Sequence, residues 1–354
     1  MKKICLKTPS TEATIYIGSD AIQTRLPMLT QGQKNFVLTD SNVYALYPDF
    51  FKKYFGDSAL FVLPAGEENK NFASLAVILE QMTGACLHRT SRLFAVGGGV
   101  IGDIGGLAAA LYMRGISCVQ IPTTLLAQVD SSVGGKTAID LGGVKNVVGA
   151  FYQPCEVLID PKFLLTLPPR EIKCGLGEIV KYAALNGEIF DLLSKHSDWT
   201  DGDFLVSLID LCVRHKAHVV EVDEKEKGER RSLNVGHTTG HAIELSSGLS
   251  HGESVLYGMK LETLMAKEAG ICKGEYAEQL LAIIDKALTL SPVEKYNFND
   301  LDKDAKKALS DKKNTGDGKI TMSVAKVKNE WTIFSLPFEE YRAALVKAAQ
   351  KLGT

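Results

Sequence analysis

The sequence predicts an α/β N-terminal half with a parallel sheet, followed by a helical C-terminal half. In the first half, short apolar runs alternate with amphipathic stretches, which is the pattern of strands joined by crossover helices. From about Pro161 onward, the apolar residues follow helical spacing almost throughout. A chain of 354 residues is long enough for two domains, so we expect one domain at residues 1–160 and another at residues 161–354.

Four apolar runs in the first half are expected to be strands. They are Asn35–Thr39, Leu60–Leu63, Leu93–Val96 and Cys118–Ile121. The segment Phe72–Gly84 has the amphipathic spacing of a helix between two of them. Strands that alternate with helices favour a doubly wound, Rossmann-like sheet.

The second half is expected to consist of helices, with one late hairpin. The helices are Pro168–Leu185, Phe204–Glu224, Val235–Ser246, Gly252–Gly270 and Glu275–Leu288, and the hairpin pairs Lys319–Val324 with Trp331–Phe334. Neither an internal repeat nor a low-complexity linker interrupts the sequence. The change of pattern near residue 160 therefore marks the expected domain boundary.

The composition excludes several classes of protein. With 40 Lys and Arg against 42 Asp and Glu, the formal net charge is −2, which gives no electrostatic footprint for nucleic acid. The most membrane-like stretch, Gly105–Met113, is far shorter than the ~20 residues that span a bilayer. The N-terminus lacks the apolar run of a signal peptide, and the seven cysteines are scattered without a CxxC pair. We therefore expect a cytoplasmic protein with neither a nucleic-acid nor a membrane partner.

Glycine is concentrated where the first half approaches a ligand. Residues 97–149 hold 12 of the 32 glycines, and Gly97-x-Gly99-x-x-Gly102 lies between an expected strand and an expected helix. The acid of an ordinary dinucleotide fingerprint is missing after the next strand, but Asp40 follows an earlier strand and suits ribose hydroxyls. The glycine loop suits a pyrophosphate. Asp103 is either part of this site or a carboxylate favoured by the helix dipole.

A second glycine-rich segment follows, with the sequence QVDSSVGGKTAIDLGGVKN. It contains Asp130, Lys136, Lys145 and Asn146. Lysines beside a nucleotide site suit phosphate and carboxylate oxygens, although lysines of this kind can also be ordinary solvated side chains. We interpret the segment as a cationic loop that binds an anionic small molecule.

Three of the seven histidines fall within 15 residues. His237 and His241 are one helical turn apart, and His251 begins the next expected helix. The HExxH pattern of metalloproteases is excluded, because a threonine occupies the position of its glutamate. A carboxylate ligand is available in Glu178, whose apolar flanks indicate an inward face shared with Lys181. This constellation predicts a metal site, and spacing alone makes both His237 and His241 candidate ligands.

The segment between the helix of Glu178 and the helix of His237 is rich in charged residues, of which some are expected to face solvent and others to bind an anion. The run Glu221–Arg231 is typical of a solvated face. Lys216 and Arg230 remain candidates for contacts with an anion. Asn234 and His237 have i, i+3 spacing and are therefore expected to face the same pocket.

With these motifs assembled, the chain resembles the sugar phosphate cyclase family, and within it the 3-dehydroquinate synthase group. The matching motifs, in order, are GEENK, GGGVIGD, YMRG, PTTLLAQVDSSVGGKT, KN, TLPPRE, GEIVKYA, KAHVV, LNVGHTTGHAIE, HGESVLYGM and DKK. The resemblance implies a dehydroquinate synthase-like fold, in which an NAD-binding α/β domain precedes an all-α metal-binding domain. It also implies a homodimer that turns 3-deoxy-D-arabino-heptulosonate 7-phosphate into 3-dehydroquinate and phosphate.

The same resemblance assigns roles residue by residue. The zinc (or cobalt) ligands would be Glu178, His237 and His251. Similar to NAD contacts are Asp40, Asn42, Glu67, Lys70, Gly98, Gly99, Val100, Ile101, Gly102, Asp103, Thr123, Thr124, Lys136, Lys145, Thr166 and Leu167. Similar to substrate contacts are Asp130, Lys136, Asn146, Lys181, Lys216, Arg230, Asn234, His241 and either Lys312 or Lys313. Arg114 would reach into the site of the neighbouring subunit, and His241 would contact the phosphate of the substrate.

Three alternatives stay open beside this interpretation. The first is an NAD- and metal-dependent polyol or alcohol dehydrogenase of the glycerol dehydrogenase type, which Lys145, Asn146 and Lys216 disfavour because a simple polyol carries no phosphate or carboxylate. The second is another sugar phosphate cyclase whose substrate lacks the carboxylate that Arg230 and Lys216 suit. The third is a non-catalytic paralogue, which the intact metal constellation disfavours.

Overall fold

The computed structural model describes residues 1–290, 296, 298, 301–309 and 318–352. The chain divides into two compact units. Unit 1 comprises residues 1–168 and 202–225, and unit 2 comprises residues 169–201 and 226–354. Unit 1 thus includes the helix α8 (Gly202–Val222), which lies beyond residue 160 in the sequence. The functional division at residue 160 stays a prediction.

A mostly parallel sheet forms the centre of unit 1. Its strands, in spatial order, are β1 (Lys2–Lys7), β2 (Glu12–Ile17), β9 (Glu156–Ile159), β6 (Ser117–Pro122), β5 (Arg92–Gly97), β3 (Asn35–Asp40) and β4 (Ala59–Leu63). Only β1 and β2 pair antiparallel in this sheet. The four strands predicted from the sequence correspond to β3, β4, β5 and β6. The Rossmann-like fold class is therefore confirmed.

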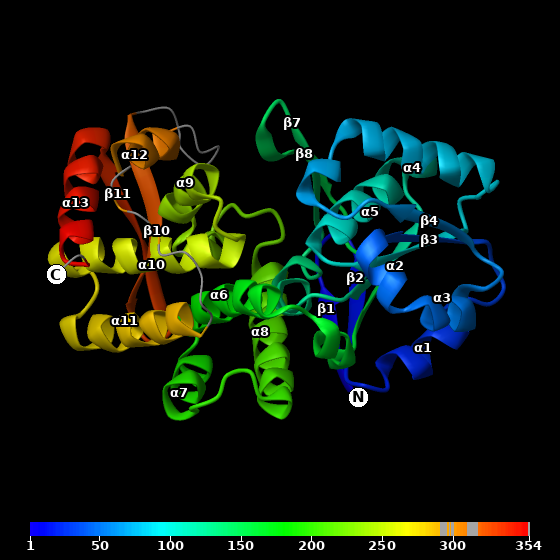
Figure 1. Cartoon of the computed structure of the whole chain (residues 1–354), viewed down its shortest axis with the longest axis horizontal. Helices are drawn as coiled ribbons and strands as arrows, with labels where there is room; N and C mark the ends of the chain where they lie inside the picture. Colours follow the sequence, from blue (N-terminus) through cyan, green and yellow to red (C-terminus); the bar gives the residue numbers. More distant parts are fainter. Residues whose placement is uncertain (291–295, 297, 299–300, 310–317, 353–354) are drawn as a thin grey trace. The chain divides into compact units, whose positions relative to one another are not determined.

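Helices cover both faces of this sheet, as Figure 1 shows. The helices are α1 (Ala21–Leu29), α2 (Ser41–Leu46), α3 (Pro48–Phe55), α4 (Phe72–Gly84) and α5 (Gly99–Leu111). Neighbouring residues of β3 enter different cores: Leu38 packs with residues of α4 and α5, whereas Val37 packs with residues of α1 and α3. This alternation is what a strand buried on both faces requires. The predicted helix Phe72–Gly84 is confirmed as α4.

The segment that we interpreted as a glycine-rich cationic loop is in large part a hairpin. Strands β7 (Lys136–Leu141) and β8 (Val144–Phe151) pair antiparallel. Gly142 and Gly143 join them with φ of +60° and +77°, as a tight two-residue hairpin turn requires. The loop interpretation was wrong for these strands, because the density of glycines concealed the Gly-Gly turn signal. Strands β1, β2 and β9 were not predicted from the sequence.

In the residues of unit 2 that the structure describes, the elements are helices and one two-stranded hairpin (Figure 1). The elements are α6 (Pro169–Leu185), α7 (Gly187–Lys195), α9 (His237–Ser247), α10 (His251–Glu268), α11 (Gly274–Thr289), α12 (Leu301–Leu309), β10 (Lys319–Val327), β11 (Glu330–Pro337) and α13 (Phe338–Gln350). Helix α10 packs against α6, α9, α11 and α13. The predicted helices and the late hairpin are confirmed, with bounds that shift by up to two residues for the helices and up to three for the hairpin strands.

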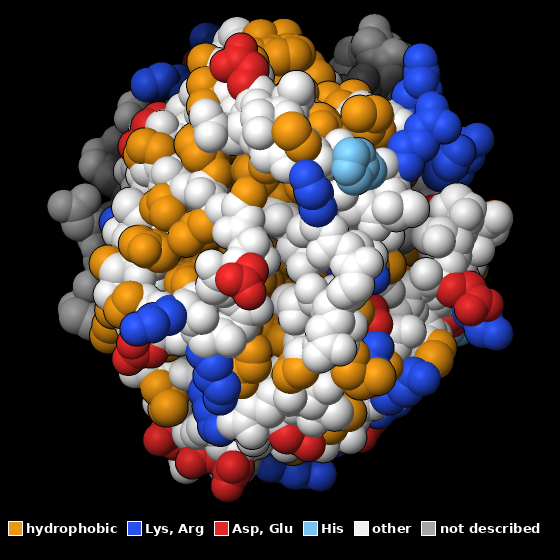
Figure 2. Space-filling view, turned by 90° about the vertical axis from the view of Figure 1, so that its right-hand side faces the viewer, with side chains coloured by type: hydrophobic (Ala, Val, Ile, Leu, Met, Phe, Trp, Pro, Cys, Tyr) orange, Lys and Arg blue, Asp and Glu red, His pale blue; other side chains and the backbone are white. Residues whose placement is uncertain are grey.

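One face of the molecule carries side chains of every kind. On the face drawn in Figure 2, hydrophobic side chains lie among charged and uncharged polar ones. Across the described part of the chain, none of the helices has both the length and the apolar character needed to cross a membrane.

Candidate functional site

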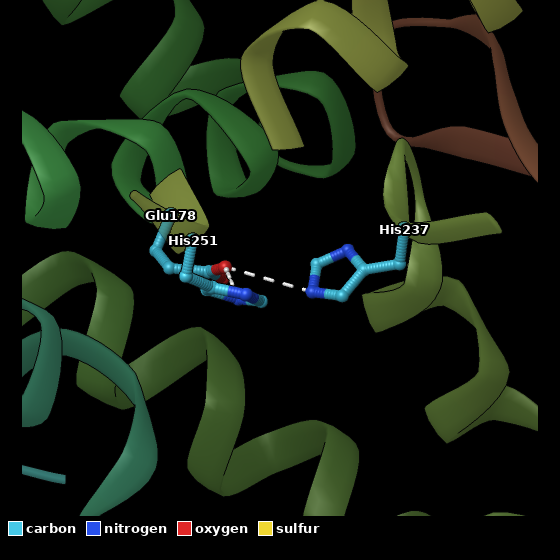
Figure 3. Close-up of side chains that lie close together, drawn as sticks. All are labelled: Glu178, His237 and His251. Carbon is cyan, nitrogen blue, oxygen red and sulfur yellow. Dashed lines mark hydrogen bonds and ion pairs between the residues drawn. The ribbon is translucent and has the colours of Figure 1, made fainter. Parts of the chain in front are cut away.

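Three helices of unit 2 bring a carboxylate and two imidazoles together. Glu178 lies on α6, His237 is the first residue of α9, and His251 is the first residue of α10. Glu178 Oε1 is 3.2 Å from His251 Nε2 and 3.5 Å from His237 Nε2, as Figure 3 shows. The ligand atoms of all three residues lie within 4.8 Å of one another. One metal ion can therefore contact all three.

Two glycines explain why Glu178 and His251 are neighbours. Helices α6 and α10 touch at Gly177 and Gly252, where a Cβ on Gly252 would lie 1.9 Å from the carbonyl oxygen of Cys174. A Cβ on Gly177 would lie 2.3 Å from the carbonyl oxygen of Gly252. Glu178 follows the first glycine and His251 precedes the second, so the close crossing of the helices places the two ligands beside each other.

The outer nitrogen of each imidazole has an acceptor in reach. His237 Nδ1 is 3.0 Å from the carbonyl oxygen of Val235, and His251 Nδ1 is 3.0 Å from Glu244 Oε2. In a neutral imidazole, an Nδ1–H that donates to such an acceptor leaves Nε2 free to bind a metal ion beside Glu178. Histidines that bind metals have this arrangement, because the acceptor fixes the tautomer and orients the ring. The residues present therefore fit a divalent metal with two nitrogen ligands and one oxygen ligand.

The charges around His251 also suit a cation. Burial lowers the pKa of His251. Hydrogen bonds to Glu178 and Glu244, together with the negative charges of these residues, outweigh burial and raise the pKa to about 10. The ammonium group of Lys181 forms an ion pair with Glu178 Oε2. Positive charge is thus stabilised at this cluster, whether it comes from a proton, an ammonium group or a metal ion.

A second group of potential ligands overlaps the first. His241, Glu244 and His251 also offer ligand atoms within 4.8 Å of one another. The ring centroids of His237 and His241 are 5.2 Å apart. Glu244 lies within the motif LNVGHTTGHAIE but was not among the predicted site residues. Its helical spacing from His237 and His241, at i+7 and i+3, was the signal that could have identified it.

The other predicted substrate contacts of unit 2 lie on two elements, α6 and the short helix η5 that precedes α9. Arg230 and Asn234 belong to η5 (Glu229–Asn234), where Arg230 is buried and Asn234 Nδ2 donates to Glu226 Oε1 over 2.7 Å. Lys181 is buried on α6, one turn after Glu178. Lys312 and Lys313 lie outside the described residues.

In unit 1, the predicted nucleotide contacts gather at the carboxyl ends of parallel strands. Gly98 follows β5 and is the N-cap residue of α5, whose first turns hold Gly99, Val100, Ile101, Gly102 and Asp103. A Cβ on Gly98 would lie 3.0 Å from Thr124 Cγ2, so part of the need for glycine comes from packing against the segment after β6. Thr123 N–H donates to the Gly97 carbonyl oxygen over 3.0 Å. The N–H groups of the first turn of α5 suit a phosphate group.

Asp40 and Thr166 already have partners within unit 1. Asp40 ends β3 and caps α2, and its Oδ1 accepts from Asn42 N–H at 2.9 Å and from Val43 N–H at 3.0 Å. The hydroxyl of Thr166 forms a hydrogen bond with the hydroxyl of Tyr47, and Leu167 follows. One oxygen of Asp40 is therefore a helix cap, whatever the other oxygen binds.

The structure joins four predicted site residues in one cluster. Lys70 is buried, and its Nζ is 2.6 Å from Asp103 Oδ2, 2.5 Å from Asn146 Oδ1 and 3.9 Å from Glu67 Oε1. Burial lowers the pKa of Lys70, but the carboxylates of Asp103 and Glu67 raise it above its ordinary value. Asp103 is thus a partner of Lys70 and not only a carboxylate near a helix N-terminus.

Of the remaining predicted residues of unit 1, two form an ion pair and three are exposed. Asp130 lies on η3 (Ala127–Ser131), where its side chain pairs with Lys216 and its carbonyl oxygen accepts from Lys216 Nζ over 2.8 Å. Lys136 and Lys145 are exposed on β7 and β8. Arg114 is exposed and has a φ of +66°, a conformation that side chains other than glycine rarely adopt.

Comparisons with known proteins agree on one family. A family model described as 3-dehydroquinate synthase N-terminal matches residues 60–174, and one described as 3-dehydroquinate synthase C-terminal matches residues 175–314. A 3-dehydroquinate synthase of Alkaliphilus metalliredigens is 40% identical over 338 residues, which cover 93% of this chain and 94% of the relative. A second relative of the same name, from Enterococcus faecalis, is 38% identical over 97% of both chains.

A solved structure extends the agreement to the fold. A 2-epi-5-epi-valiolone synthase from Streptomyces hygroscopicus, solved with NAD+ and Zn2+ bound, is 27% identical and has a TM-score of 0.82. The match covers 99% of this chain and 100% of the other.

Proposed function

The chain belongs to the 3-dehydroquinate synthase family, and from this membership we propose that it converts 3-deoxy-D-arabino-heptulosonate 7-phosphate into 3-dehydroquinate and inorganic phosphate. This is a lyase reaction of the shikimate pathway, which leads to chorismate and the aromatic amino acids. The observation that carries the proposal is the convergence of Glu178, His237 and His251, with an acceptor beside the outer nitrogen of each imidazole.

Two cofactors serve this reaction, NAD and a divalent metal, zinc or cobalt. Bound NAD would oxidise a secondary alcohol of the substrate, which acidifies the neighbouring C–H, and would return the hydride in the same turnover. A bound metal would act as a Lewis acid toward the hydroxyl oxygens of the substrate. The valiolone synthase relative, which carries NAD+ and Zn2+, supports both assignments.

The metal would be held by Glu178, His237 and His251. Three protein ligands leave coordination positions for the substrate, as a catalytic site needs. Val235 and Glu244 hold the two imidazole rings in the orientation described above. Lys181, which pairs with Glu178, would turn to the substrate once a metal compensates the carboxylate.

The NAD contacts are assigned to unit 1. The pyrophosphate would lie at the first turn of α5, at Gly98–Gly102, and Asp40 would accept from ribose hydroxyls. The other proposed contacts are Asn42, Glu67, Lys70, Asp103, Thr123, Thr124, Lys136, Lys145, Thr166 and Leu167. Lys70 and Asp103 neutralise each other, so that together they add no net charge beside the dinucleotide.

The substrate carries a phosphate and a carboxylate, and cationic side chains are assigned to both. We assign Lys216 and Arg230 to the carboxylate and Lys136, Arg114 and His241 to the phosphate. Asp130, Asn146, Lys181, Asn234 and one of Lys312 and Lys313 complete the set of proposed contacts. The phosphate of the substrate itself can accept the proton that is removed, so a separate protein base is not required.

The enzyme is proposed to act as a homodimer in the cytoplasm. Large hydrophobic side chains are exposed on the β7–β8 hairpin and at the end of α5, two elements that pack together in unit 1. They are Leu111, Met113, Leu141, Val144, Val147 and Phe151. Arg114 lies within this region, which is consistent with its proposed role in the site of the partner subunit.

Phosphate release and NADH, measured together, test the proposal. The purified chain with NAD and Zn2+ should release phosphate from the heptulosonate phosphate over many turnovers without accumulating NADH, and chelation of the metal should stop the release. Stoichiometric NADH with glycerol, and no phosphate release, would contradict the proposal and favour a polyol dehydrogenase. Release from a sugar 7-phosphate that lacks the carboxylate, but not from the heptulosonate phosphate, would indicate another cyclase.

A further inference from the structure

Helix α9 begins without a capping side chain of its own. Its N-cap residue is Gly236, with a φ of +76°. A Cβ on Gly236 would lie 2.1 Å from Met259 Cγ and 2.9 Å from the carbonyl oxygen of Val255, so α10 excludes a larger residue here. The serine, threonine or aspartate that usually caps a helix cannot occupy this position.

A carboxylate of α10 supplies the missing cap. Glu262 is 1% exposed, and its two oxygens accept from two backbone groups of α9. Gly236 N–H donates to Oε2 over 2.9 Å, and Thr239 N–H donates to Oε1 over 2.8 Å. Thr239 is the third helical residue, whose N–H is one of those that a capping side chain normally satisfies.

The two hydrogen bonds lie on either side of His237. This residue follows Gly236 directly and is the first residue of the helix, two positions before Thr239. The ring of His237 is oriented by Val235, but its Cα can only be as well placed as the backbone that carries it. Since Nε2 must lie within bonding distance of a metal shared with Glu178, a small displacement of this helix end would move the ligand out of reach.

We propose that Glu262 is a positioning residue for the metal site, which fixes His237 by capping α9 from the neighbouring helix. The inference rests on the proposed function only in taking His237 as a metal ligand. Glu262 would act through the backbone groups of Gly236 and Thr239, on either side of His237, and not by binding the metal, the substrate or NAD.

The test is Co2+ binding to the full-length, metal-stripped chain, followed by the visible absorption of the bound ion. In Glu262→Gln, the amide oxygen can accept one N–H but the NH2 group cannot accept the other. We expect Co2+ affinity to fall roughly tenfold and the absorption bands to shift, because the ligand geometry changes. Glu268→Gln is the matched control, since it removes a carboxylate from α10 that pairs with Lys347 and not with α9. It should bind Co2+ as the unaltered chain does.

A second variant separates positioning from general stability. Glu262→Asp keeps the charge but is one methylene too short to reach both N–H groups. Its Co2+ affinity should therefore lie between those of the unaltered chain and Glu262→Gln. A purely structural role would lower the thermal midpoint and leave the Co2+ spectrum of the folded protein unchanged, which would overturn the proposal. If neither Glu262→Gln nor Glu262→Asp folds, the proposal is also rejected, because Glu262 is then required for folding in general. If the unaltered chain does not bind Co2+, it is the proposed metal site that fails.

Discussion

His237 and His241 lie one helical turn apart on α9, and both can reach a metal ion that also contacts His251. The proposed function gives them different roles, with His237 as a ligand and His241 as a contact of the substrate phosphate. The outer nitrogen of His237 is already oriented by Val235, which favours His237 as the ligand. The two roles differ in whether the side chain binds the metal, so the metal content of variants at each position can distinguish them.

We predict that His237→Ala loses most of its bound metal together with its activity. His241→Ala should keep about one metal per chain but release phosphate more slowly. Metal analysis of the two purified variants, with phosphate release from the heptulosonate phosphate, is the measurement. Equal loss of metal in both variants would mean that His241 is a ligand, in the arrangement that also includes Glu244.

Lys70 provides a pH-dependent prediction at the same scale. Lys70→Met leaves the buried carboxylate of Asp103 without its partner, and should lower the free energy of unfolding by about 3 kcal/mol at neutral pH. Because the folded chain raises the pKa of Lys70, the stabilisation is fully present below the ordinary lysine pKa and is lost as the pH rises through the folded value. On the alkaline side of neutrality, denaturant unfolding of both chains should therefore show a difference that begins to shrink above about pH 10.5.

The control for Lys70 is an exposed pair. Lys7 and Glu12 form an ion pair in which both side chains are mostly exposed, so Lys7→Met should have little effect at any pH. A difference between the unaltered chain and Lys70→Met that is absent at pH 7, or that persists unchanged at strongly alkaline pH, would contradict the assignment.

At the scale of the element, the close crossing of α6 and α10 should tolerate no side chain. Gly252→Ala places a methyl group against the Cys174 carbonyl oxygen, so we expect a loss of about 3 kcal/mol or more and weaker metal binding. Thermal unfolding and metal titration are the measurements. Gly274→Ala, at the start of α11, meets no atom within 4 Å and should leave both quantities nearly unchanged. A stable, metal-binding Gly252→Ala variant would show that the crossing does not set the site.

The elements also show how far the sequence could be interpreted. Helix α4 was predicted to the residue, because its apolar spacing is regular and Asn71 caps it. The β7–β8 hairpin was not, because its glycines were attributed to ligand binding. The role of Gly177 and Gly252 was invisible, since a glycine inside a helix does not reveal which other helix approaches it. For the same reason Glu262 gave no signal, because its partners are backbone groups on another helix.

At the scale of the whole molecule, the proposed dimer predicts complementation between two inactive chains. If Arg114 acts in the site of the partner and Lys136 in the site of its own chain, mixing Arg114→Ala with Lys136→Ala gives some hybrid dimers with one intact site. Part of the activity should return, measured as phosphate release after subunit exchange. Unchanged inactivity, with exchange confirmed by differently tagged chains, would argue that Arg114 acts within its own chain.

Removal of the metal is the corresponding prediction for unit 2. Chelation should abolish activity but leave the helical circular dichroism spectrum unchanged, and the thermal midpoint should fall by the amount that mass action gives. A ligand at a hundred times its dissociation constant contributes about 2.7 kcal/mol. Loss of the helical spectrum on chelation would contradict this expectation, as would a midpoint that is independent of metal concentration.

That expectation follows from the glycines at the crossing of α6 and α10. In a zinc finger, the ion must gather its ligands from an unfolded chain, so much of its binding free energy is consumed in folding. Here the crossing is a contact between two helix backbones, so we expect Glu178 and His251 to be brought together by the fold before an ion binds. The free energy of metal binding is then available for affinity, and exchange of one divalent ion for another requires no refolding. We therefore expect zinc and cobalt to replace each other at this site without loss of the fold.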